Sequence, residues 1–414
     1  MFVARIAQSL SAVAFVVVLS ACSVQKSAES VFPQNGAMDN RACMGQAIEN
    51  KFIVQWEDGH FSVEEAVNAD VFTKEFIEPR LSDIKHVTYD REFSIEKTST
   101  TVQASAYTDS WGQDMIGARQ LWSQGIKGEG VAVAIVDSFV DVNHTQLAPR
   151  ILLNTAEIPN NGIDDDGNGI VDDYTGGVFV SKPSANPTPS AHGSHVAGII
   201  GADPSYGPIE GVAPKASLIP AQFLSNSGSG SLGDAIKALQ YAASRGAKVI
   251  NASWGGAPCD GALYSAFKTL ESKGILVVVA AGNEGADIDA YPTFPAAFNV
   301  GTQITVAAGN SFDIMTAWSN SGFNLVHLGA PGEGILSTIP NNSTAYMDGT
   351  SMAAPFVSGA AALIWGVKPQ ATAVQVKQAL LQSVDVSPGR EYRTSTRGRL
   401  NVVKALQKLR ELVP

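Results

Sequence analysis

The stretch VAVAIVD (131–137) decides the fold class, because it is an unbroken apolar run that ends in a carboxylate. Alternating apolar and polar residues would indicate a strand with one solvated face, whereas a continuous apolar run indicates a strand covered on both faces. The same character recurs in three later segments, KVINASW (248–254), ILVVVAAGN (275–283) and QITVAA (303–308). Such strands are typical of a parallel sheet that lies between two other layers.

Helical patterns separate these strands. In LGDAIKALQYAASRG (232–246), apolar residues recur with helical spacing on one face, and the pattern ends at Gly246. Strands that alternate with helices predict an α/β fold, with a parallel twisted sheet and helices on both faces. Ligands of such sheets bind at the carboxyl ends of the strands, where this chain places Asp137 and Asn283.

The composition allows one large domain and a smaller companion. The chain has 414 residues, of which 45% are hydrophobic, so it can bury a sizeable core. Its formal net charge is −11, and its 28 Lys and Arg residues are scattered rather than clustered. A polyanion would be repelled overall, and we therefore expect no nucleic-acid partner.

The first residues have the features of an export signal. Met1–Ala21 carries Arg5 near its start and an apolar run too short to span a membrane. The run ends in LSAC (19–22), which resembles the lipobox of bacterial lipoproteins, in which Cys22 takes the lipid. The alternative is a plain signal peptide with an incidental cysteine. Ser23 follows the cysteine, which by the same resemblance favours the outer membrane or the cell surface.

A small module precedes the main domain. After a polar tether (22–49), the region 50–98 predicts an α+β module, with a strand in KFIVQWEDG (51–59), a helix in VEEAVNADVF (63–72) and one or two strands in IKHVTYDREFSIE (84–96). A Ser- and Thr-rich linker (99–108) then leads to the domain 109–414. Cys43 and Cys259 either form a disulfide in an oxidising compartment or remain unpaired thiols.

Three polar residues match the needs of nucleophilic catalysis. Asp137 closes a buried strand, His192 opens the helical pattern HGSHVAGIIG, and Ser351 opens SMAAPFVSGAAALIW, where Pro355 is expected in the first turn. In a triad the hydroxyl attacks, the imidazole transfers the proton, and the carboxylate holds the imidazole in place. The small residues around Ser351 leave room for a substrate backbone.

Four blocks carry a family resemblance: VAVAIVDSFVDVNHTQL (131–147), HGSHVAG (192–198), VINASWGG (249–256) with VVVAAGNEG (277–285), and GTSMAAPFVSGAAAL (349–363). In this order they resemble the motifs of subtilisin-like serine proteases, the subtilases, over roughly 109–412. The resemblance implies a monomeric endopeptidase that hydrolyses protein or peptide substrates through Asp137, His192 and Ser351 and an acyl-enzyme intermediate. The alternative is a catalytically silent subtilase fold that serves as a surface binding lipoprotein.

The same resemblance assigns further site residues. Asn283 would supply the side chain of the oxyanion hole together with the backbone amide of Ser351; the alternative is an asparagine that caps a turn. His195 is expected to be structural, and a zinc site at His192 and His195 is disfavoured because no third ligand accompanies them. Substrate is expected to add as a strand beside two backbone segments, which contain Gly228, Ser229 and Gly230 in one and Ser253, Trp254 and Gly255 in the other.

An acidic block, NGIDDDGNGIVDD (161–173), predicts a calcium site. Its candidate ligands have the spacing of an EF-hand-like loop, although Thr175 stands where the bidentate glutamate would be. The alternative is a solvated acidic loop. The predicted ligands are Asp164, Asp166, Asn168 and Asp172.

The N-terminal module has a candidate role by the same resemblance. Subtilases often carry a propeptide that assists folding and fills the cleft until it is cut, so the chain would be a zymogen. We expect the cut near residues 97–110, and it would separate the catalytic domain from a lipid on Cys22.

Overall fold

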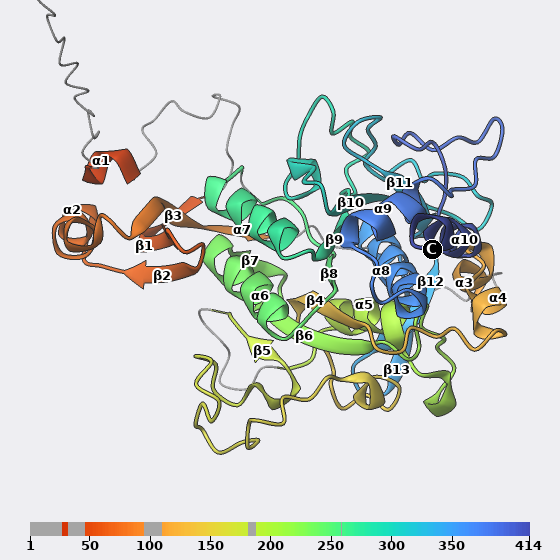
Figure 1. Ribbon diagram of the computed structural model, residues 1–414, viewed down its shortest axis with the longest axis horizontal. Coiled ribbons are helices and arrows are strands. Elements are labelled where there is room, and N and C mark those ends of the chain that lie inside the picture. Colours follow the sequence, from red (N-terminus) through yellow and green to blue (C-terminus); the bar gives the residue numbers. More distant parts are fainter. Residues whose placement is uncertain (1–26, 32–45, 95–109, 181–187, 258) are drawn as a thin grey trace, which may run out of the picture.

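The computed structural model describes residues 27–31, 46–94, 110–180, 188–257 and 259–414 (Figure 1). The predicted signal peptide (1–21), Cys22, Cys43 and the linker 99–108 lie outside the described residues, as does most of the predicted tether.

A seven-stranded sheet forms the centre of the main domain, and each pair of neighbouring strands in it is parallel, which confirms the predicted class. The strand order is β11-β10-β9-β8-β4-β6-β5. The strands are β4 (Ala132–Ser138), β5 (Gly177–Val178), β6 (Ser217–Leu224), β8 (Val249–Ala252), β9 (Leu276–Ala280), β10 (Gln303–Gly309) and β11 (Leu328–Pro331).

Helices cover both faces of this sheet (Figure 1). Alternate residues of β4 point to opposite sides, so that Val133 and Ile135 enter one core while Ala134 and Val136 enter the other. The first core lies under α3 (Trp111–Met115), α4 (Ala118–Trp122), α5 (Ala191–Gly201), α8 (Thr350–Val367), α9 (Ala373–Leu381) and α10 (Val402–Leu412). The second lies under α6 (Leu232–Ser244) and α7 (Gly261–Ser272).

Shorter elements complete the domain. An antiparallel hairpin of β12 (Ile335–Ile339) and β13 (Ser343–Met347) packs on α5. The single turns of 3₁₀ helix are η3 (Ala148–Arg150), η4 (Asp173–Thr175), η5 (Pro204–Tyr206) and η6 (Ala296–Phe298).

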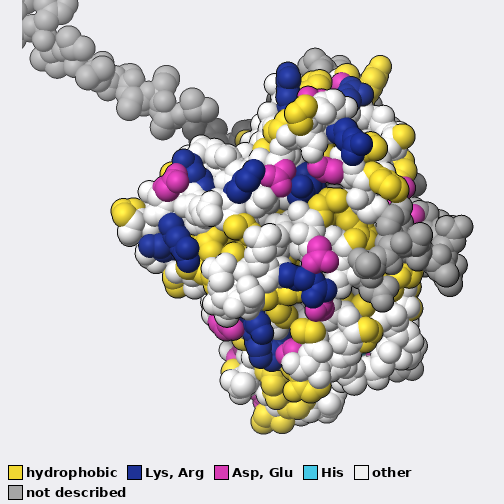
Figure 2. All heavy atoms as spheres, turned by 90° about the vertical axis from the view of Figure 1, so that its right-hand side faces the viewer, with side chains coloured by type: hydrophobic (Ala, Val, Ile, Leu, Met, Phe, Trp, Pro, Cys, Tyr) yellow, Lys and Arg dark blue, Asp and Glu magenta, His cyan; other side chains and the backbone are white. Residues whose placement is uncertain are grey.

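Among the described helices, α8 alone is long and apolar enough to cross a membrane by length and composition. However, 89% of its apolar window is buried inside the protein, which marks it as the central helix of the core. On the face shown in Figure 2, basic and acidic side chains are interspersed, and no continuous basic patch forms there.

The N-terminal module is a small sheet with a helical segment at its outer end. It contains α1 (Ala28–Val31), β1 (Gln46–Trp56), β2 (Phe61–Glu65), a helical run of α2 (Ala69–Val71), η1 (Phe72–Ile77) and η2 (Glu78–Arg80), and β3 (Ile84–Ser94). The helix predicted for 63–72 is wrong in its first part, because residues 63–65 belong to β2. β2 pairs with β1, and Phe61 packs into the core under α6 and α7. The strand β1 begins at Gln46, inside the region expected to be tether.

The module and the main domain share one sheet. Its strand order is β2-β1-β3-β7, in which β7 (Ser229–Ser231) belongs to the main domain. The module therefore lies beside α6 and α7, at the left of Figure 1.

Candidate active site

Two of the predicted catalytic residues are joined by a hydrogen bond. Asp137 lies near the carboxyl end of β4 and is fully buried, and His192 is the second residue of α5. Nδ1 of His192 lies 2.7 Å from Oδ1 of Asp137. The imidazole is thereby oriented with its other nitrogen, Nε2, directed away from the carboxylate.

Ser138 fixes this pair from the side. Its backbone N–H and its hydroxyl both donate to Oδ1 of Asp137, at 2.7 and 3.0 Å, and its Oγ accepts from the backbone N–H of Gly193 at 3.1 Å. A Cβ on Gly193 would lie 2.3 Å from the carbonyl oxygen of Ser138, so only glycine allows α5 to approach β4 this closely. The backbone of Gly193, which bonds to Ser138, therefore helps to position the His192 imidazole together with the bond from the imidazole to Asp137.

The environment of His192 shifts its acidity in two opposing ways. Burial lowers the pKa of the imidazole, but the negative charge of Asp137 and the hydrogen bond to it outweigh that effect. The net result is a His192 pKa raised above its ordinary value of 6.5. The Asp137 carboxylate thus favours the imidazolium form that a general base adopts during the reaction.

Ser351 lies in the first turn of α8 and exchanges two hydrogen bonds with Ser253. The Ser351 hydroxyl donates to the Ser253 carbonyl at 3.1 Å, and the Ser253 hydroxyl donates to the Ser351 carbonyl at 2.8 Å. The second bond has a clear cause. Pro355 has no N–H to pair with the carbonyl four residues earlier, so the hydroxyl of Ser253 takes that place. Pro355 is the sixth residue of α8, and its expected place in the first turn is wrong.

No hydrogen bond joins His192 to Ser351 within the described residues. Nε2 of His192 is buried and has no partner there, while the Ser351 hydroxyl is engaged with Ser253. Helices α5 and α8, which carry these two residues, pack against each other. Hydrogen bonds between catalytic groups are often long or misaligned before substrate binds and tighten in the complex with substrate.

Asn283 is oriented by the residue that precedes Ser351. Its Oδ1 accepts from the backbone N–H and the hydroxyl of Thr350, at 2.8 and 2.9 Å. The side-chain amino group of Asn283 makes no hydrogen bond within the described part of the chain. The backbone N–H of Ser351 has no intrahelical acceptor either, because it lies in the first turn of α8. Two donors thus remain available beside the serine.

His195 has a structural position. Its Nε2 lies 3.0 Å from the carbonyl oxygens of Ile335 and Ala345, which belong to β12 and β13. Burial is the main cause that lowers the His195 pKa to about 3, so the side chain is neutral at physiological pH. It ties α5 to the hairpin.

The predicted substrate-binding segments lie on either side of the end of β3. Residues Glu92–Ser94 pair antiparallel with Ser229–Ser231 of β7, so Ser229 and Gly230 already form a strand ladder. Gly228 precedes that strand with a φ of 81°. On the other side, a Cβ on Gly256 would lie 3.5 Å from the carbonyl oxygen of Ser94. The module thus places an extended chain where substrate was expected.

Phe93 fills an aromatic pocket at this place. Its ring centroid lies 5.8 Å from that of Trp254 and 6.0 Å from that of Phe223. Phe93 is 7% exposed and Trp254 is 1% exposed. The indole nitrogen of Trp254 is buried without a hydrogen-bond partner in the described residues.

Polar contacts hold the module at the N-termini of two helices. Oδ1 of the fully buried Asp90 accepts from the backbone N–H of Gly233, in the first turn of α6, at 2.8 Å. Thr88 donates to Asp260 at 3.2 Å, and Asp260 is the N-cap of α7. A carboxylate at a helix N-terminus is favoured by both the unpaired N–H groups and the helix dipole.

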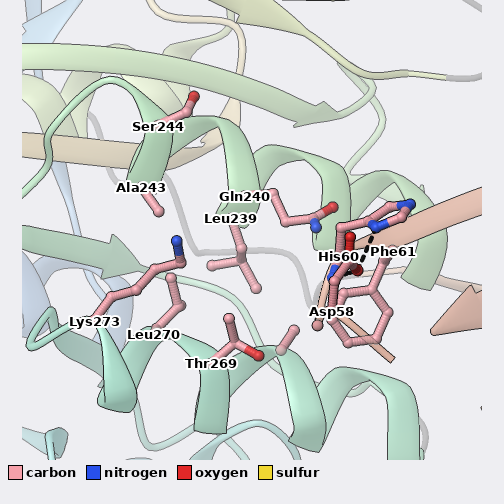
Figure 3. A pocket seen from close by; sticks show the side chains of 12 residues that line it. Asp58, His60, Phe61, Leu239, Gln240, Ala243, Ser244, Thr269, Leu270 and Lys273 are labelled. Atoms are coloured by element: carbon pink, nitrogen blue, oxygen red, sulfur yellow. Dashed lines mark hydrogen bonds and ion pairs between the residues drawn. The ribbon is translucent and has the colours of Figure 1, made fainter. Parts of the chain in front are cut away.

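A cavity of about 250 Å³ lies between the module and helices α6 and α7. Figure 3 shows Leu239 and Leu270 facing each other across it, with Lys273 at one end and the hydrogen-bonded pair Asp58 and His60 at the other. None of the predicted catalytic residues lines this cavity.

The acidic loop brings together a different set from the one predicted. Glu157, Asp164 and Asp166 each place an oxygen within 4.8 Å of the others. Glu157 is 3% exposed, and its Oε2 is buried without a hydrogen-bond partner in the described residues. Asp172 is not among these clustered carboxylates, whereas the backbone N–H of Asn168 donates to Asp164 at 3.1 Å and to Asp166 at 3.0 Å.

Asn168 and Asp172 make hydrogen bonds within the loop. The side-chain nitrogen of Asn168 donates to Asp166 at 3.1 Å and to Asp173 at 3.3 Å. The Asp172 carboxylate accepts from the backbone N–H groups of Asn161 and Gly162, each at 3.0 Å. Asn168 therefore contacts the cluster through Asp166, while Asp172 holds the backbone at Asn161 and Gly162.

Several residues of the site were not among the predicted ones. Ser138 and Thr350 lie inside the quoted motifs, next to Asp137 and Ser351, and that position is their only sequence signal. Glu157 lies seven residues before the acidic loop's first candidate ligand, outside the spaced pattern, so no signal identified it.

Comparisons with known proteins place the chain in one family. Residues 128–404 match the Subtilase family of peptidases. The chain is 38% identical over 258 residues to the major intracellular serine protease of Bacillus subtilis (strain 168), covering 61% of this chain and 74% of that protein. It is 34% identical over 302 residues to thermitase of Thermoactinomyces vulgaris (72% and 95%) and 34% identical over 276 residues to subtilisin DY of Bacillus licheniformis (66% and 91%).

The fold, the site and these similarities define a serine endopeptidase, a hydrolase that acts on protein or peptide substrates. Within that class, the chain belongs to the subtilase family.

Proposed function

We propose that this protein cleaves peptide bonds through Asp137, His192 and Ser351 and an acyl-enzyme intermediate. The observation that supports it most is the buried 2.7 Å hydrogen bond between Asp137 and His192, which leaves Nε2 of the imidazole without a partner in the described residues. The Ser351 hydroxyl gives its proton to Nε2 as Oγ attacks the scissile carbonyl carbon. His192 then returns the proton to the leaving amine, and water hydrolyses the ester by the same sequence.

The negative charge that develops on the carbonyl oxygen needs donors. We assign this role to the side-chain amino group of Asn283 and the backbone N–H of Ser351. The two hydrogen bonds from Thr350 to Oδ1 of Asn283 support the assignment, because they hold Oδ1 at Thr350 and leave the amino group of the same side chain directed away from Thr350.

The N-terminal module acts in this proposal as an inhibitory propeptide. Its strand β3 pairs with β7 as a substrate would, and Phe93 occupies the pocket beside Trp254. While β3 stays there, a substrate cannot form the same backbone hydrogen bonds. Release of the module is therefore required before substrates bind in these segments.

We further propose that the protein is exported and carries lipid on Cys22, which would anchor it to the outer membrane or the cell surface. The support is the LSAC motif at the end of an apolar signal-like run. We also propose that the acidic loop binds calcium. Glu157, Asp164 and Asp166 offer three carboxylates, and the orphaned Oε2 of Glu157 gains a partner when a hard cation binds.

A fluorophosphonate probe tests the catalytic assignment, because it reacts covalently with an activated serine. Wild type should be labelled once the module has been cut and released, and Ser351→Ala should abolish both labelling and peptide hydrolysis. Ser272→Ala, which removes an exposed hydroxyl on α7, is the matched control and should behave as wild type. A folded wild-type protein that is neither labelled nor active after its module has been released would overturn the proposal in favour of a silent binding lipoprotein.

A further inference from the structure

The loop after β9 carries Asn283, and its backbone is held by one fully buried side chain, that of Asn320. Oδ1 of Asn320 accepts from the backbone N–H groups of Ala286, at 2.8 Å, and Glu284, at 3.2 Å. Its Nδ2 donates to the carbonyl of Ala281 at 3.0 Å and to the carboxylate of Glu284. The side-chain amide of Asn320 thus makes hydrogen bonds to residues that precede and follow Asn283 in the loop.

The backbone of Asn320 adds a further contact at the same place. Its N–H donates to the carbonyl of Gly282 at 2.9 Å. Gly282 has a φ of 105°, and a Cβ there would lie 2.3 Å from Nδ2 of Asn320. Gly282, the residue before Asn283, therefore packs directly against the Asn320 side chain.

Asn320 is itself fixed to the central sheet. The hydroxyl of Ser319 donates to the carbonyl of Asn320 at 3.0 Å and accepts from the backbone N–H of Ala308 in β10 at 2.9 Å. The chain of contacts runs from a core strand through Asn320 to the loop. Such support from buried, fully hydrogen-bonded groups is what holds a catalytic donor in place before the reaction.

We propose that Asn320 is a positioning residue for the oxyanion hole, which acts through Asn283 and contacts neither substrate nor the reacting atoms. The inference rests on the role proposed above for Asn283. The chemistry explains why an amide is needed, since the loop presents a carbonyl and two N–H groups to the same side chain. An aspartate would lose the donation to Ala281 and would place a carboxylate next to that of Glu284.

The test measures kcat and KM for a peptide substrate in wild type, Asn320→Ala and Asn320→Asp, with each preparation normalised to the serine titrated by a fluorophosphonate. We expect Asn320→Ala to lower kcat by at least about 10-fold while KM changes less than about twofold, since the oxyanion forms only in the transition state. A peptide boronic acid, which forms a tetrahedral adduct with the serine, should lose affinity by a similar factor.

A double-mutant cycle separates positioning from general damage. In the Asn283→Ala background the donor is already gone, so Asn320→Ala should cost less than about threefold more. Asn401→Ala, which removes the N-cap of α10, is the control that lowers stability and leaves kcat unchanged. If Asn320→Ala does not fold, Asn320→Asp carries the same cycle.

Two results would overturn the inference: losses from Asn283→Ala and Asn320→Ala that multiply in the double variant, or a folded Asn320→Ala with wild-type kcat. The proposed function fails differently, because Ser351→Ala and Asn283→Ala would then leave hydrolysis intact. The two failures are therefore distinguishable in one set of variants.

Discussion

Phe93→Ala should loosen the N-terminal module from the cleft without unfolding either part of the protein. The ring lies at the junction between the two parts, packed against Trp254 and Phe223 and only 7% exposed. It belongs to the core under α6 and α7 and not to the module's own core, in which Phe52 and Phe72 stack. Its removal should therefore weaken docking and leave the fold of the module in place.

The magnitude follows from the burial of the ring. A buried phenylalanine truncated to alanine costs about 3 to 5 kcal/mol. We use the lower end, about 3 kcal/mol, because water fills part of the space that the ring leaves at an interface. Since about 1.4 kcal/mol corresponds to a factor of ten, the population in which β3 has left β7 should rise roughly 100-fold.

Amide hydrogen exchange measures this population directly. Ser351→Ala serves as the background, so that the chain cannot cut itself during the measurement. Amides of β3 and β7 that pair with each other should exchange about 100-fold faster after Phe93→Ala, since exchange reports local opening. Amides of β10, in the central sheet, should not change. Phe312→Ala, which removes a 63% exposed ring from the main domain, is the matched control.

The reasoning is refuted if Phe93→Ala accelerates exchange in β3 and β7 by less than about threefold. It is also refuted if β10 amides accelerate equally, because the effect would then be global destabilisation. Phe93→Leu should give a smaller acceleration, as it keeps part of the apolar surface.

Three further predictions concern His192, the acidic cluster and Cys22. The His192 pKa is raised, and only the neutral imidazole acts as a base, so kcat/KM of wild type should fall as the pH drops through a midpoint above 6.5. In Asp137→Asn, burial is the one remaining influence on the imidazole, and the midpoint of the pH profile should lie below 6.5. The contribution of the Asp137–His192 pair to the free energy of unfolding is fully present below pH 6.5 and is lost as the pH rises through the folded-state pKa of His192. Calcium should raise the melting temperature of wild type but not that of Glu157→Gln. Glu411→Gln is the control and should respond to calcium as wild type does. Equal shifts of the melting temperature in all three proteins would exclude the cluster as the calcium site. Cys22→Ser should move the protein from the membrane to the soluble fraction in a bacterial host, and an unchanged distribution would contradict lipid anchoring.

The central sheet could be predicted because its strands are recognisable one by one. Residues 131–136 and 275–281 are apolar without interruption, and a two-sided layer is the arrangement that buries such strands fully. The rule that parallel strands place ligands at their carboxyl ends then singled out Asp137 and Asn283. These predictions needed only local patterns and a general rule of topology.

The failures arose where a distant partner decides the local structure. The segment 63–72 has a helical pattern, yet its first residues are a strand because β1 lies beside them. Glu157 gave no signal, because its proximity to Asp164 depends on how the intervening loop folds back. Asn320 lies far along the chain from Asn283, and only the packed core brings its amide to the loop. Spacing in a sequence does not encode contacts of this kind.

The contacts of the module also bear on how a cut would act. Asp90 binds the N-terminus of α6, Thr88 binds Asp260, and Phe93 packs on Trp254, and each of these residues of the module lies on the N-terminal side of the expected cut at 97–110. Cleavage there would break none of these interactions; it would remove only the covalent link, which keeps the effective concentration of the module high. A cut chain should therefore stay inhibited until the module unfolds, is digested or dissociates. If Cys22 carries lipid, the same contacts would hold the cut catalytic domain at the membrane, so that activation and release become one event.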